Sequence, residues 1–322
     1  MKKLPISLGL AVLLAGCGAG GEGAGPAAPV AVETPAPADQ PAQAVPPQSA
    51  ADVTGERLAA VLAGSWRSEE NRARDAWRHP RETLEFFGVK AGDTLIEISP
   101  GGGWYTEVLA PLLKGSGRYI AAIAADASSD YARKNNEKYR AKLQANAADF
   151  GDVTLVEFDP KAPSFGAPES ADVVVTFRNA HNWARAGTAP AMFKAFHDVL
   201  KPGGVLGVTD HRAAAGAPAD QVDESGYIPT EYVIKLATDA GFRLAGQSEV
   251  NANPKDTKDY EKGVWTLPPT LTLGDQDRAK YVAIGESDRM TLKFVKPKAD
   301  AIFQQGDSQP ADPAAATEPA GD

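Results

Sequence analysis

Apolar segments and helical segments alternate along most of this chain, and the alternation limits the folds open to it. The short apolar segments are rich in Val, Ile and Leu, as buried strands are. The segments between them carry the end signals of helices; Pro80, for example, begins a segment that Gly88 ends. Strands separated by helices form parallel sheets through right-handed crossovers that cover both faces. We therefore expect an α/β domain built on a parallel sheet.

Seven strands are expected, with helices between most of them. The strands are predicted at 94–99, 118–123, 153–158, 171–177, 205–210, 242–250 and 290–295. The helices are predicted at 54–62, 72–78, 80–87, 106–114, 128–147, 188–200 and 229–240. No helical period between the last two strands clearly serves as a crossover, which predicts that the final strand is antiparallel. In an open sheet of this kind, ligands bind at the carboxyl ends of the strands.

The N-terminus has the pattern of an export signal. Lys2 and Lys3 precede an apolar stretch at 4–15, which is too short to span a membrane, and the only cysteine follows at Cys17. Leu14-Ala15-Gly16-Cys17 resembles the lipobox of bacterial lipoproteins. The resemblance implies a signal peptide at 1–16 that is cleaved before Cys17, and acylation of that cysteine by palmitate or a similar chain. We expect an exported protein, lipid-anchored to a bacterial membrane and facing the periplasm.

Composition separates the two ends of the chain from its body. Residues 17–50 are rich in Ala, Pro and Gly with no aromatic residue, and 304–322 are similar and acidic. Such segments bury too little apolar area to fold, so we expect a disordered tether and a disordered tail around one domain at 51–303. The net charge of −9 argues against nucleic acid as a partner, and a single Cys excludes an internal disulfide.

A glycine-rich turn follows the first strand of the sheet. The segment reads Glu97-Ile98-Ser99-Pro100-Gly101-Gly102-Gly103-Trp104-Tyr105, and a helix is expected to begin just after it. Glycines between a strand and a helix let a ligand approach the backbone and meet free N–H groups at the helix start. Alone the motif is weak, because three glycines also make an ordinary tight turn.

The order of motifs resembles class I S-adenosylmethionine-dependent methyltransferases over about 84–297. The features are the glycine turn, Asp159 at the end of the third strand, Leu200-Lys201-Pro202-Gly203-Gly204 before the fifth, and Ala240-Gly241-Phe242 before the sixth. The Pro-Gly-x-Gly-Trp-Tyr form is similar to that of a bacterial group of predicted methyltransferases. The resemblance implies a doubly wound, mostly parallel, seven-stranded Rossmann-like sheet with an antiparallel last strand. It also implies S-adenosylmethionine as cofactor.

By the same resemblance, particular residues are assigned to the cofactor. They are Glu97, Ser99, Gly101 and Gly103 in the first motif, Asp126 after the second strand, Asp159 at the adenine, and Asn179 after the fourth strand. Two positions depart from the family pattern. Ser99 replaces the usual first glycine, and Asp126 comes two or three residues late. Asp126 either binds the ribose hydroxyls from a longer loop or caps the helix that begins near Ser128.

Two histidines are the candidates for acid–base chemistry. His181 follows the fourth strand and His211 ends the fifth, so both loops open on the cofactor edge if these strands are parallel. Histidine titrates near neutral pH and can take a proton from a methyl acceptor. The alternative is that each only packs or hydrogen-bonds at a strand end. Asp210 with both histidines also offers metal ligands, but their spacing is not diagnostic, and we assign no metal.

Two further segments are expected near this edge. The insertion at 251–286, with Trp265, forms either a lid or substrate wall or else a stabilising flap. A cluster of Arg72, Arg74, Asp75, Arg78 and His79 either closes the other side or is a solvated helix face, and we favour the solvated face.

Two functions from different classes remain. The first is a membrane-anchored methyltransferase acting on a small-molecule or lipid-like acceptor. The second is a non-catalytic binding lipoprotein that keeps the fold and reuses its pocket. A serine hydrolase is disfavoured because no Gly-x-Ser-x-Gly turn is present.

Overall fold

The computed structural model describes residues 50–218 and 223–298. The predicted signal peptide, Cys17, the acidic tail and all of the predicted tether except Ala50 lie outside these residues. Within the described ranges, no helix has the length and apolar character needed to cross a membrane.

One seven-stranded sheet forms the centre of the fold. Its strands are β1 (Thr94–Ile98), β2 (Arg118–Ala124), β3 (Thr154–Phe158), β4 (Ala171–Phe177), β5 (Leu200–His211), β6 (Arg243–Ser248) and β7 (Arg289–Val295). Their spatial order is β3-β2-β1-β4-β5-β7-β6. The first five pair in parallel, and β7 runs antiparallel to both β5 and β6. The expected α/β sheet with an antiparallel last strand is confirmed.

Helices connect and flank these strands. They are α1 (Ala50–Leu62), α2 (Glu69–Ala73), α3 (Asp75–Arg78), α4 (Pro80–Phe87), α5 (Thr106–Leu113), α6 (Asp130–Ala145), α7 (Ala147–Phe150), α8 (Ala180–Arg185), α9 (Ala189–Val199), α10 (Thr230–Asp239) and α11 (Arg278–Ile284), with 3-10 turns η1 (Asp126–Ser128) and η2 (Gly263–Thr266). Pro80 opens α4, and Gly88 ends it in the left-handed conformation, as expected.

The fifth strand is longer than the sequence predicts. The Lys-Pro-Gly-Gly segment was expected to separate the helix from the strand, yet β5 already begins at Leu200. Leu200 pairs with Ala171 of β4, and Gly203 and Gly204 exchange backbone hydrogen bonds with Lys296 just after β7. Neighbouring backbones therefore extend the strand through residues whose local preference is for a turn.

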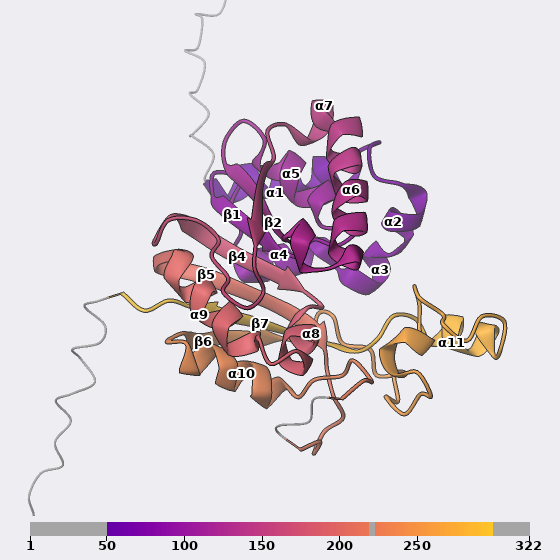
Figure 1. Ribbon diagram of the computed structural model, residues 1–322. Coiled ribbons are helices and arrows are strands. Elements are labelled where there is room, and N and C mark those ends of the chain that lie inside the picture. Colours follow the sequence, from indigo (N-terminus) through magenta and orange to yellow (C-terminus); the bar gives the residue numbers. More distant parts are fainter. Residues whose placement is uncertain (1–49, 219–222, 299–322) are drawn as a thin grey trace, which may run out of the picture. The chain divides into compact units, whose positions relative to one another are not determined.

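Two apolar cores cover the two faces of the sheet. In β1, Ile96 and Ile98 pack with α9 and α10, whereas Leu95 packs with α1, α4 and α5. Figure 1 shows α5 and α6 on one side of the sheet and α9 and α10 on the other. Burial of both faces explains why the central strands are continuously apolar. It also leaves the carboxyl edge of the sheet for polar side chains.

Candidate functional site

A cavity of about 900 Å³ lies at the carboxyl ends of the parallel strands. Its wall comes from the glycine turn after β1, the end of β2 and the start of α6, the turn after β4 with α8, and the end of β5. The N-terminal helical region contributes Asn71, Arg74 and Arg78 to the wall, and the insertion contributes Trp265. The cavity therefore lies where an open parallel sheet is expected to bind ligands.

The glycine turn presents bare backbone to this cavity. A β-carbon at Gly101 or Gly102 would meet nothing within 4 Å, and both residues line the wall. Gly103 is different: it has φ 74°, and a β-carbon there would lie 3.0 Å from the Tyr139 ring, so this glycine allows α6 to pack closely. The turn thus has an open face toward the cavity and a packed face toward the protein.

Ser99 takes the conformation that a glycine would hold more easily. Its φ is 53°, in the left-handed region, and it lines the cavity beside Pro100. Its N–H donates to Ala122 O at 2.8 Å, so the adjacent strands hold it in place. A side chain in this region costs about 1 kcal/mol or more. The turn keeps its shape despite the departure from the family pattern.

Glu97 lies behind the turn and does not line the cavity. Its carboxylate is 2% exposed and accepts hydrogen bonds from the hydroxyls of Tyr119 and Thr106. Burial raises the pKa of Glu97 to about 7, although these two hydrogen bonds and Lys142 oppose the change. Glu97 therefore ties β1 to β2 and α5 beneath the turn.

Asp126 is held by the protein itself. Asn136 Nδ2 donates to Asp126 Oδ1 at 2.7 Å, and Arg140 pairs with the same carboxylate at 3.0 Å. These hydrogen bonds, from Asn136 first and then Arg140, lower the pKa of Asp126. Ser129, not Asp126, caps α6 by accepting from Ala132 N, so the capping alternative is wrong. Asp126 is not in the cavity wall, which Asn136 reaches instead.

Asp159 faces solvent, and Asn179 lines the cavity. Asp159 is exposed, and its carboxylate accepts from Lys161 N at 2.9 Å in a local turn. Only the following residue, Pro160, reaches the wall. Asn179 Nδ2 lies 3.2 Å from Ile98 O and 3.0 Å from Thr176 Oγ1. Asn179 thus joins the ends of β1 and β4 at the edge of the glycine turn.

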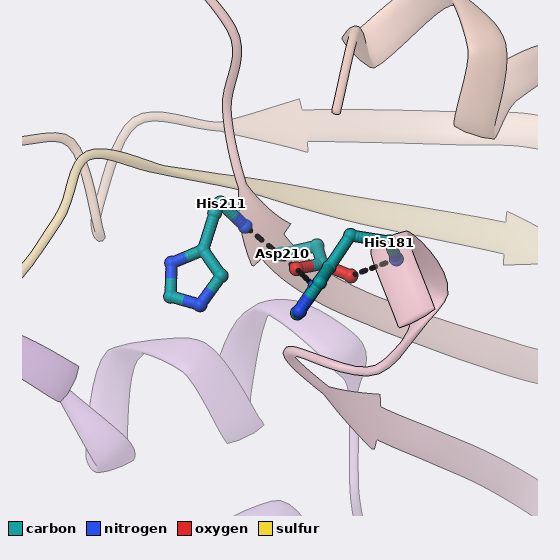
Figure 2. Close-up of side chains that lie close together, drawn as sticks. All are labelled: His181, Asp210 and His211. Atoms are coloured by element: carbon teal, nitrogen blue, oxygen red, sulfur yellow. Dashed lines mark hydrogen bonds and ion pairs between the residues drawn. The ribbon is translucent and has the colours of Figure 1, made fainter. Parts of the chain in front are cut away.

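Both histidines contact the carboxylate of Asp210. His181 lies in α8, and Asp210 and His211 lie at the end of β5. Figure 2 shows Asp210 between the two histidines. His181 Nδ1 lies 2.8 Å from Asp210 Oδ1, and the backbone N–H groups of both histidines also donate to this carboxylate. Because Asp210 is an acceptor, His181 Nδ1 carries the hydrogen, and its Nε2 keeps a lone pair. The two rings are 5.2 Å apart, and both line the cavity.

The surroundings of His211 are electropositive. Burial first, then His181, Arg178 and other arginines, lower the pKa of His211 well below its usual value. Its Nδ1 lies 2.5 Å from Ser287 Oγ, which orients the ring. His181, Asp210 and His211 also offer ligand atoms within 4.8 Å of one another, as a metal would require. Neighbouring arginines make this a poor environment for a further cation.

Two arginines of the predicted N-terminal cluster, Arg74 and Arg78, line the cavity, so interpreting them as part of a solvated helix face is wrong. Arg78 is 2% exposed, and Arg74 and Arg78 both line the wall. Trp104 of the glycine motif explains their position: its Nε1 donates to Asn71 O at 3.0 Å, and its ring lies 4.6 Å from the Arg78 guanidinium. The aromatic residue that follows the glycine motif therefore attaches α2 and α3 to it. The sequence did contain a signal for this placement: an Arg-rich helical segment precedes a glycine motif that is followed by a Trp.

The insertion contributes to both the wall and stability. Trp265 lines the cavity 6.2 Å from the His181 ring, so part of the segment forms a wall of the cavity. At its end, Glu286 pairs with Arg74 at 2.6 Å and with Arg78 at 3.2 Å. Burial alone would raise the pKa of Glu286, but Arg78, Arg289 and Arg74 outweigh it and lower that pKa to about 2. The two alternatives for this segment are therefore not exclusive.

Comparison with known proteins adds a family match. Residues 96–208 match a family model described as a methyltransferase domain. The match runs from β1 to β5 and includes the glycine turn and His181. Comparison with curated protein sequences yields no match.

Solved structures align over most of this chain. The [4+2]-cyclase SpnF aligns with TM-score 0.50 and 15% identity, covering 76% of this chain and 94% of that one. The glycopeptide N-methyltransferase MtfA aligns with TM-score 0.48 and 16% identity, covering 71% and 100%. A SAM-dependent methyltransferase from Aquifex aeolicus gives TM-score 0.47 and 15% identity, covering 70% and 93%. At 15% identity the likeness to SpnF concerns the fold alone. The chain has the α/β Rossmann-like methyltransferase fold, and the family match supports a methyltransferase.

Proposed function

We propose that this protein is an S-adenosylmethionine-dependent methyltransferase acting on a small-molecule or lipid-like acceptor. One observation carries the proposal: a single cavity is lined both by the bare backbone of Gly101 and Gly102 and by His181, which the buried Asp210 holds from behind the wall. A nucleotide-like cofactor needs the first, and deprotonation of an acceptor needs the second.

The wall offers groups that fit the cofactor. The open face of the glycine turn admits a ligand against the backbone, and Ser129, Asn135 and Asn136 provide polar groups beside it. Pro160 adds an apolar surface at the end of β3. These residues would hold the cofactor, with Asn136 in place of the acid implied at the ribose. When bound, the cofactor supplies a methyl group on a positively charged sulfur.

His181 is the proton acceptor in this proposal. Asp210 holds Nδ1, so Nε2 is free to take the proton that the acceptor's nucleophile loses as it is methylated. Asp210 also stabilises the resulting imidazolium. His211, which burial and neighbouring cations keep neutral, packs against His181 and helps to exclude water together with Trp265.

Calorimetry with S-adenosylhomocysteine tests the cofactor proposal, with Gly102→Val as the decisive variant. A β-carbon at this exposed position would meet no protein atom within 4 Å, and the residue has no positive φ, so the fold should tolerate a valine whose side chain extends into the cavity. We expect binding in the micromolar range for the wild type and at least about a tenfold loss for the variant. Gly92→Val is the matched control, since Gly92 is equally open but precedes the opposite end of β1. Absence of binding to the wild type, or equal binding by both variants, would refute the proposal.

A non-catalytic binding protein is the second candidate, and two placements favour it. The Asp126 carboxylate is hydrogen-bonded by Asn136 and Arg140, and Asp159 is exposed to solvent. Neither of these two acids, which were assigned by resemblance, lines the cavity. This candidate predicts no heat with S-adenosylmethionine or S-adenosylhomocysteine. Micromolar binding of either compound would count against it.

We further propose that the chain is a lipoprotein exported to the periplasm and anchored through Cys17. The Leu14-Ala15-Gly16-Cys17 segment behind a short apolar stretch supports this. Cys17→Ser should move the protein from the membrane fraction to the soluble fraction in immunoblots. Unchanged retention in the membrane fraction would contradict acylation.

A further inference from the structure

One part of the cavity wall is strongly basic. Among the residues that the structure describes, no Asp or Glu lines the cavity, and the arginines that line it are Arg74, Arg78, Arg178 and Arg185. The chain as a whole has 42 acidic residues against 33 basic ones, so this local surplus of positive charge opposes the overall balance. An anionic ligand is the chemistry that such a wall matches.

Two of these guanidinium groups have unused donors inside the protein. Arg78 is 2% exposed; its Nε pairs with Glu286, but its Nη2 is buried with no hydrogen-bond partner. Arg74 repeats the arrangement, with Nε on Glu286 and a buried Nη2 without a partner. A buried donor without an acceptor destabilises the protein, and a ligand oxygen would supply the missing acceptor.

Arg178 faces the same cavity from the end of β4. Its backbone is held in the left-handed conformation, with φ 63°, and its N–H donates to Thr209 O at 2.7 Å. Within the described part of the chain, its side chain has no hydrogen bond or ion pair. Its guanidinium is therefore positioned by the backbone rather than by a partner.

The positive charge of these arginines is only partly neutralised by the carboxylate of Glu286. Glu286 pairs with Arg74, Arg78 and Arg289 together. Burial first, and then nearby arginines, lower the pKa of Arg78, and burial and Arg289 lower the pKa of Arg178 to about 10. Arginine side chains keep their charge in proteins, so Arg78 and Arg178 repel one another across the wall.

We propose that Arg74, Arg78 and Arg178 form an oxyanion subsite that binds a carboxylate or phosphate group of the methyl acceptor. A ligand anion would complete the neutralisation that Glu286 begins, and the positive wall favours an anionic acceptor over a neutral or cationic one. That the anion belongs to a methyl acceptor rests on the proposed function. The subsite itself does not, because it follows from the arginines alone.

The cofactor's own carboxylate is the alternative source of the anion. A titration with inorganic phosphate at constant ionic strength, with and without saturating S-adenosylhomocysteine, separates the two. We expect phosphate to bind in both conditions, with dissociation constants that agree within about twofold. Loss of phosphate binding once S-adenosylhomocysteine is present would assign the arginines to the cofactor and overturn the proposal.

Arg178→Gln is the decisive variant because this side chain supports no other residue. We expect phosphate affinity to fall at least about tenfold, and Arg178→Lys, which keeps the charge, to recover most of it. Arg243→Gln is the matched control: Arg243 is exposed, begins β6 and is not in the cavity wall. Equal phosphate affinity in Arg178→Gln and the wild type, or no phosphate binding at all, would overturn the subsite. Arg178-dependent phosphate binding without any binding of S-adenosylhomocysteine would refute only the proposed function.

Discussion

Replacing Glu97 by Gln should change how the stability of this protein depends on pH. Glu97 lies in the centre of the sheet beneath the glycine turn, 2% exposed, with Thr106 3.2 Å from its carboxylate and Tyr119 also donating to it. Burial raises its pKa from 4.5 to about 7. Glutamine keeps the shape and an acceptor oxygen but has no proton to lose.

The direction and size of the effect follow from proton linkage. The folded state holds the Glu97 proton more tightly than the unfolded state does, so the associated stability is fully present below pH 4.5 and is lost as pH rises through about 7. The difference between 4.5 and about 7 corresponds to roughly 3 kcal/mol, at about 1.4 kcal/mol for each pH unit. Glu97→Gln avoids this loss. Its stability relative to the wild type should therefore rise by roughly 3 kcal/mol between about pH 4.5 and pH 8.

Urea unfolding across this pH range measures the effect. Glu82→Gln is the control, because Glu82 is an exposed glutamate in α4. We expect the control curve to run parallel to the wild type, and the Glu97→Gln curve to diverge upward as pH increases. A Glu97→Gln curve parallel to the wild type would show that Glu97 is not held protonated by burial and would refute this reasoning.

Three further variants test other parts of the site. His211→Asn should lose less stability on acidification below pH 6.5 than the wild type does, because burial keeps folded His211 neutral while the unfolded histidine gains a proton; equally steep urea-unfolding curves would contradict this. Trp104→Leu should cost about 3 kcal/mol of unfolding free energy, because it removes the ring beside Arg78 and the hydrogen bond to Asn71; a loss below about 1 kcal/mol would show that Trp104 does not hold α2 and α3. Asp126→Asn should change the calorimetric affinity for S-adenosylhomocysteine by less than about threefold, because Arg140 already holds this carboxylate away from the cavity; a tenfold loss would indicate direct contact.

The strands and their directions could be anticipated because each strand has a local sequence signal. Apolar runs and glycine turns predicted the parallel strands, and the lack of a crossover predicted the antiparallel β7. Errors arose where neighbouring backbones override local preference. Leu200–Gly204 reads as a turn, yet hydrogen bonds with Lys296 and pairing with Ala171 extend β5 through it.

The site residues assigned from the sequence fall into two groups, those that line the cavity and those that do not. Ser99, Gly101, Asn179, His181 and His211 line the cavity, because each follows or ends a strand whose direction was predicted. Glu97, Gly103, Asp126 and Asp159 do not line it. Their side chains or β-carbon positions face other residues or solvent, and which way a side chain points after a strand depends on partners such as Arg140 that are distant in sequence.

What the sequence by itself determined is the α/β sheet, the edge of the sheet at which the cavity lies, and the glycine turn and histidines on that edge. Periodicity and turn chemistry are local properties, so they can be read along the chain. Only the tertiary structure decided the charge of the cavity. Arg74 and Arg78 reach the wall because Glu286, more than 200 residues away in the chain, and Trp104 hold them there. Contacts at that separation leave no periodic signal, since they depend on how α2, α3 and the insertion pack around the finished sheet.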